Sequence, residues 1–142
     1  MTLSFQGNIV IVIQVVALIL LTIGVYPYRI RTKNRNLIVH GFLSIIALAL
    51  NLATIFSVMV PVFSASLDAL GNLSILQRTV VWVHVGSGVA AVTLGLAIIV
   101  SWIIHPLGEL SCSKTWRLMI PTFVIWAFAL ILGIIIHVYN TV

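Results

Sequence analysis

Four histidines, His40, His84, His105 and His137, are the residues of this sequence whose side chains could do chemistry. A neutral imidazole can bind iron, copper or zinc, and two imidazoles from facing helices can hold a b-type haem from both sides. Two imidazoles alone are an incomplete zinc site, because structural zinc takes four ligands. Haem fits better because it supplies four ligands of its own, so the histidines predict haem b.

The sequence lacks the residues that other common catalytic and metal sites require. The long apolar stretches contain no Asp or Glu, which excludes a Ser-His-Asp set and paired carboxylates there. The sequence has neither a phosphate-binding loop nor a HExxH zinc motif. Its one cysteine, Cys112, excludes a disulfide or a thiolate cluster within the chain. We therefore predict no catalytic residue, and whether the protein is an enzyme stays open at this point.

The composition decides which environment holds these histidines. Of 142 residues, 62% are hydrophobic and 6% are charged, with seven Lys or Arg against two Asp or Glu. A soluble domain is about 45–50% apolar and about 25% charged. So few charges cannot solvate a water-soluble globule, which excludes a soluble enzyme, a disordered chain and a nucleic-acid-binding domain. We predict a single domain, residues 1–142, embedded in the lipid bilayer.

Four apolar stretches without Asp, Glu, Lys or Arg approach or exceed the length that crosses a bilayer, roughly 20 residues in a helix. They are residues 9–26, 37–63, 79–104 and 118–139. None shows the alternation of a strand, so a β-barrel is not expected. Short connections favour antiparallel neighbours. We therefore predict an all-α fold, an up-down-up-down bundle of four transmembrane helices.

The charges between these segments predict how the chain is oriented. Six of the seven basic residues lie in the connections 27–36 and 105–117. Cytoplasmic loops of membrane proteins carry an excess of Lys and Arg. We therefore predict that both connections are cytoplasmic, in a multi-pass protein of the cell membrane. The connection 64–78 and both termini then lie outside.

Counting residues from the segment ends sorts the histidines into two levels. At 1.5 Å per residue, His84 and His137 lie roughly 8 Å and roughly 3 Å below the outer boundary, which predicts a haem between them. His40 lies roughly 6 Å above the inner boundary and His105 lies near it, which predicts a second, inner haem. The alternative for each is a histidine near a span end that only hydrogen-bonds to lipid headgroups or water.

Two further features of the segments bear on packing and ligands. Gln14 and Asn51 lie near mid-membrane on neighbouring segments, and we expect them to hydrogen-bond to each other. The same polar pair is the only cue for a quinone site, and it is a weak one. Small residues recur on the third segment: Gly86, Gly88, Ala90, Ala91 and Gly95. They predict close helix packing, with a flat ligand pressed against the helix as the alternative.

Three different short motifs lie at or near the starts of the second, third and fourth segments. His40-Gly41 opens the second, WVHVG (residues 82–86) lies early in the third, and WRLMIPT (residues 116–122) leads into Trp126 of the fourth. In these features the chain resembles the small four-helix membrane family that includes the bacterial YozB and CtaM proteins. The resemblance covers most of the chain at low identity.

This resemblance implies a link to haem-copper oxidases, as an assembly factor or accessory subunit. It also implies haem b binding similar to that of cytochrome b561-type carriers. Trp116 stands where the family usually has a histidine, so either His105 replaces that ligand or the inner site is absent. His137 lies where relatives often carry a tyrosine, which favours an outer haem special to this branch.

Two classes of function follow. The first is a haem-binding protein of the respiratory chain, which would hold haem at His84 and His137 and carry electrons within or across the bilayer. The second is a non-catalytic accessory subunit or assembly factor of a larger membrane complex such as a terminal oxidase, because so short a chain has little mass outside the membrane. A quinone-handling enzyme is a third, more weakly supported class.

Overall fold

The computed structural model describes residues 2–29, 35–104 and 109–141, with side chains described for 6–23, 39–104 and 117–139. Its elements are α1 (Thr2–Arg29), α2 (Arg35–Thr54), the π-helical turn η1 (Ile55–Met59), α3 (Val60–Ser66), the short 3-10 helix η2 (Ala69–Asn72), α4 (Ile75–Ile104) and α5 (Glu109–Thr141). The described ranges contain no strand, and the prediction of an all-α fold is confirmed.

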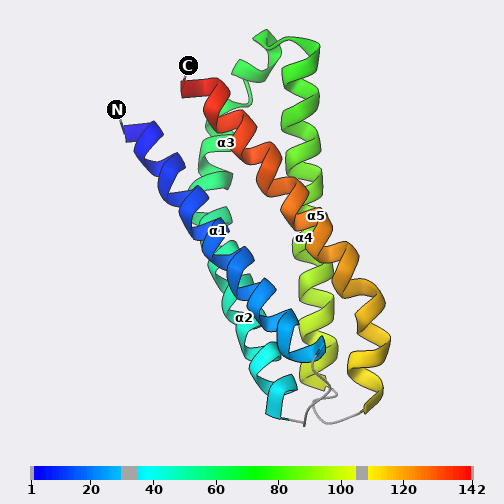
Figure 1. Ribbon diagram of the computed structural model, residues 1–142. Coiled ribbons are helices and arrows are strands. Elements are labelled where there is room, and N and C mark those ends of the chain that lie inside the picture. Colours follow the sequence, from blue (N-terminus) through cyan, green and yellow to red (C-terminus); the bar gives the residue numbers. More distant parts are fainter. Residues whose placement is uncertain (1, 30–34, 105–108, 142) are drawn as a thin grey trace.

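The long helices form two closely packed pairs. α1 packs along α2, and α4 packs along α5. The pairs meet through smaller contacts of α1 with α5 and of α2 with α4. Figure 1 shows the start of α1 and the end of α5 at the same end of the molecule as α3 and η2. At this end Phe63 of α3 packs edge-on against Trp82 of α4, with 5.6 Å between ring centroids.

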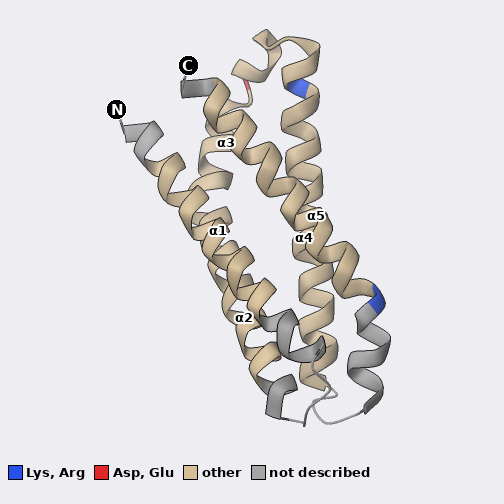
Figure 2. Cartoon of the chain, viewed as in Figure 1, with Lys and Arg blue, Asp and Glu red and all other residues tan. Residues whose placement is uncertain are grey.

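Four stretches of the described chain are long and apolar enough to cross a membrane. They are Gln6–Ile23, Val39–Ser66, Ile75–Ile104 and Arg117–Tyr139. Each overlaps one of the segments predicted from the sequence, with ends that differ by a few residues. Figure 2 colours the charged residues of the described chain, which lie towards the ends of the bundle with long uncharged stretches between them. The fold is therefore consistent with a multi-pass membrane protein.

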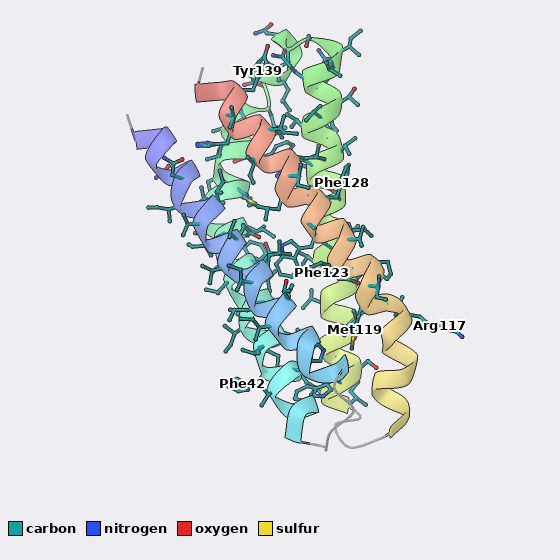
Figure 3. The ribbon with its side chains drawn as sticks, viewed as in Figure 1. Phe42, Arg117, Met119, Phe123, Phe128 and Tyr139 are labelled. Atoms are coloured by element: carbon teal, nitrogen blue, oxygen red, sulfur yellow. The ribbon has the colours of Figure 1, made fainter. Side chains whose placement is uncertain are left out.

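The centre of the bundle is built from small side chains around one large one. Ala17, Ala47, Ala91 and Trp126 are buried together, and each comes from a different long helix. Lipid gives helices no hydrophobic reason to associate, so close approach through small residues is what holds them together. Large apolar side chains instead face outward, as Phe42 does, with 63% of its surface exposed (Figure 3). Lipid covers such a surface better than water.

A wider turn interrupts the second membrane-crossing helix. The N–H of Val60 donates to the carbonyl of Ile55, five residues back, which makes η1 a π-helical turn. Pro61, the next residue, has no N–H to donate to the Ser57 carbonyl, and in a regular α-helix its ring would crowd that carbonyl. The π turn accommodates the proline, so that α2, η1 and α3 follow one another without a break.

Candidate functional site

Four hydrogen-bonded side chains lie in the buried centre of the bundle, and we call them the Gln14 cluster. The amide Nε2 of Gln14 on α1 donates to Asn51 Oδ1 (2.8 Å) and to Thr54 Oγ1 (2.6 Å), both on α2. The indole Nε1 of Trp126 on α5 donates to Gln14 Oε1 (3.2 Å). All four residues are buried. The predicted bond between Gln14 and Asn51 is confirmed.

The Gln14 cluster joins three helices through one amide group. The hydroxyl of Thr54 donates its own proton to the backbone carbonyl of Asn51 (2.8 Å), which leaves its oxygen to accept from Gln14. Each interhelical bond of this kind contributes about 0.6 kcal/mol on average in a membrane protein. None of the four side chains is an acid, a base or a good metal ligand. The cluster therefore fixes how α1 is rotated against α2 and α5, and its role is structural.

His84 on α4 has the best-defined ring of the candidate ligands. Its Nδ1 lies 2.9 Å from the backbone carbonyl oxygen of Ala129 on α5. A carbonyl only accepts, so Nδ1 carries the proton and donates. The Cε1 edge of the ring lies over Gly133, where a Cβ would come within 3.0 Å of it. Nε2 then carries the lone pair, and the structure gives it no hydrogen-bond partner within the described residues.

His137, near the end of α5, contacts the beginning of α1. Its Nε2 lies 2.9 Å from Oδ1 of Asn8. An amide oxygen only accepts, so Nε2 is the donor. The same ring occupies the space over Gly7, because a Cβ there would collide with its Cε1 and Nδ1 atoms. Helix α1 therefore positions His137, whereas helix α5 positions His84.

The structure brings His84 and His137, which were predicted to share a haem, to the same region of α5 but not to the same level along its axis. Gly133, which lies under the His84 ring, is four residues before His137, so the two positions share a face of α5. They differ by about 6 Å along the helix axis. The contacts of each ring run to a different helix. If His84 and His137 were to bind one haem iron together, at least one of the two rings would have to turn.

His40 lines a small cavity between the four long helices. The cavity has a volume of about 70 Å³, which is room for about two water molecules at about 30 Å³ each. Its walls are mostly apolar and include Met119 (Figure 3), with Ser44 and Thr122 as further polar residues. Pockets for drug-sized ligands have about 300–1,000 Å³. The inner haem predicted at His40 does not fit this cavity unless the surrounding side chains move.

The second predicted inner ligand, His105, lies outside the described residues. Its pairing with His40 therefore stays a prediction. In the part of the chain that is described, no three His, Cys, Asp or Glu side chains gather where they could hold a metal ion. A haem held by one or two histidines needs no such group, since the macrocycle supplies the other ligands.

The small residues of α4 divide into two groups. Ala91 is buried in the core, and a Cβ at Gly95 would lie 3.5 Å from Leu48 of α2. Gly86 and Gly88 have nothing within 4 Å of the position of a Cβ among the described residues. The prediction of close packing therefore holds for Ala91 and Gly95. The other two glycines make no such contact with the described residues.

Fold and site together define a class, a helical membrane protein with histidines positioned by its own helix contacts. Comparison with known proteins adds no relative to this class: no family model, no curated protein and no solved structure matches the chain. The resemblance to the family of YozB and CtaM therefore stays a prediction.

Proposed function

We propose that the protein binds haem b in the membrane through His84 and serves electron transfer in a respiratory chain. The observation that supports this is the His84 ring, whose Nδ1–H is held by the Ala129 carbonyl while Nε2 keeps a lone pair. Metal-binding histidines commonly donate their other N–H to a backbone carbonyl or a carboxylate, which fixes the ligand nitrogen. An unpaired acceptor at membrane depth is otherwise unfavourable.

The described residues fit one haem ligand better than two. His84 offers its Nε2, whereas the Nε2 of His137 donates to Asn8 and would have to leave it to bind iron. The bound group would supply the redox chemistry, and the chain would supply an imidazole ligand and apolar surroundings that exclude water. We therefore place one haem at the outer level, with His84 as its main ligand.

A reduced-minus-oxidised spectrum of the protein, purified in detergent with added haem, tests this proposal. We expect a Soret band that is lost in His84→Ala and weakened or shifted in His137→Ala. Ser87→Ala is the control, because Ser87 Oγ donates to the backbone carbonyl of His84 (3.0 Å) and not to its ring, so the band should stay. Absence of a Soret band contradicts haem binding. A band unchanged in His84→Ala contradicts the ligand assignment.

We also propose that the chain runs up-down-up-down, with both termini outside and the connections 27–36 and 105–117 in the cytoplasm. The basic excess of these connections supports the orientation. The shared end of α1 and α5 in Figure 1 supports termini on one side. This orientation assigns His84 and His137 to the outer half of the bilayer and His40 to the inner half.

A different observation favours the second candidate function, an accessory subunit or assembly factor of a terminal oxidase. Gly86 and Gly88 lie open on α4, and small residues in membrane helices commonly mark contact with another helix. We expect Gly86→Leu to reduce co-purification with an oxidase that is identified by its own spectrum. Ala53→Leu, at an exposed position of α2, is the control. Undiminished co-purification of Gly86→Leu contradicts this function.

A further inference from the structure

The two outer histidines are positioned in the same way by different helices. The His84 ring lies over Gly133 of α5 and donates to a backbone carbonyl beside it, and the His137 ring lies over Gly7 of α1 and donates to Asn8. Each glycine admits the flat ring, and each acceptor takes one ring nitrogen. We infer that these contacts hold His84 and His137 in opposite neutral tautomers, with Gly133, Gly7 and Asn8 as positioning residues.

The assignment follows from the chemistry of the two acceptors. The Ala129 carbonyl cannot donate, so His84 carries its proton on Nδ1 and its lone pair on Nε2. The side-chain oxygen of Asn8 cannot donate either, so His137 carries its proton on Nε2 and its lone pair on Nδ1. The doubly protonated form of His84 would place a charge in the membrane, which is unfavourable.

The glycines make these orientations specific. At Gly133 a Cβ would lie 3.0 Å from Cε1 of His84, closer than ordinary contact, and at Gly7 a Cβ would overlap the His137 ring. Larger residues at either place would push the ring away from its acceptor. At Gly86, on the same helix as His84, a Cβ meets nothing within 4 Å among the described residues. This contrast provides a matched control.

The tautomers have a consequence that rests on the proposed haem function. His84 presents the Nε2 lone pair without any change in its contacts, whereas His137 presents it only after losing Asn8. Asn8 would therefore decide whether the outer site has one imidazole ligand or two. The tautomers themselves are a property of the chain without haem, so they can be measured even if haem does not bind.

The experiment is long-range ¹H–¹⁵N correlation on the full chain, labelled in its histidine rings, in lipid bilayers without haem. Signals are assigned with His84→Gln and His137→Gln. We expect an unprotonated Nε2 for His84 and an unprotonated Nδ1 for His137. Asn8→Leu removes the acceptor of the His137 Nε2–H, so it should shift the ¹⁵N signals of the His137 ring and leave those of His84 unchanged. Gly133→Ala should do the same to His84.

Two control variants separate these effects from general disturbance. Gln6→Leu changes an exposed polar side chain two residues before Asn8, and Gly86→Ala adds a Cβ in open space; both should leave the two rings as in the wild type. The inference is overturned if the wild-type rings share one tautomer or are both averaged. It is also overturned if Asn8→Leu leaves His137 unchanged. The wild-type spectrum decides the assignment even if a variant does not fold.

Discussion

At the scale of single residues, the amide group of Gln14 makes three interhelical hydrogen bonds in the centre of the bundle. We expect Gln14→Leu to lower the free energy of unfolding by about 2 kcal/mol, at about 0.6 kcal/mol for each lost bond with a further cost for buried partners left unpaired. Reversible unfolding in detergent or bicelles measures the change. Thr93→Val, which removes an exposed hydroxyl bonded only to its own helix, should change it by less than about 0.5 kcal/mol. Equal effects of the two substitutions would contradict this role.

The residues of the site were predictable only in part. The depth of Gln14 and Asn51 along their segments was enough to predict their bond, since both lie near mid-membrane. The partners of the histidines were not predicted, because Asn8 and Ala129 belong to other segments and nothing in a linear sequence gives their distance. The signal in the sequence was glycine: Gly7 and Gly133 lie inside helices, where glycine is unfavourable unless a neighbouring group needs the space.

At the scale of the helices, a glycine whose neighbour leaves no room for a Cβ and a glycine whose neighbour leaves that room should respond oppositely to alanine. At Gly41 a Cβ would lie 2.6 Å from the indole ring of Trp102, so Gly41→Ala should destabilise the bundle by about 1–3 kcal/mol. At Gly95 a Cβ would be at ordinary contact distance, 3.5 Å from Leu48. Gly95→Ala should therefore stabilise it by about 0.5–1 kcal/mol through helix propensity. Unfolding measurements on both variants check the opposite signs; a shared sign would contradict the packing at one of them.

The number and extent of the helices could be predicted, but their rotation could not. Long runs without charge define four membrane-crossing stretches, because the bilayer sets a minimum length. Each helix is apolar on nearly every face, so the pattern does not indicate which face turns inward. The open position of Gly86 and the buried position of Ala91, five residues apart on one apolar helix, depend on that rotation.

At the scale of the whole molecule, the orientation in the bilayer can be tested by labelling two cysteines, the native Cys112 and one introduced at position 74. Cys112 lies in the connection predicted to be cytoplasmic, and Ser74, between η2 and α4, lies in the connection predicted to be outside. A membrane-impermeant maleimide added to intact cells should label Ser74→Cys in a Cys112→Ser background. The native Cys112 should react only after the cells are permeabilised. The reverse pattern would contradict the orientation drawn from the basic loops.

The π-helical turn at Ile55–Met59 lets its helix absorb a change of one residue in length. Such a turn holds one residue more than regular winding requires, and a residue advances an α-helix by about 100°. The wider turn absorbs that rotation, so deleting one residue there, together with Pro61→Ala, would return the helix to regular winding and leave Gln14 and its partners in place. The edge-on contact of Phe63 with Trp82 beyond the turn would also be kept. A chain of this kind could thus lose or gain a single residue at this point without changing the contacts on either side of it.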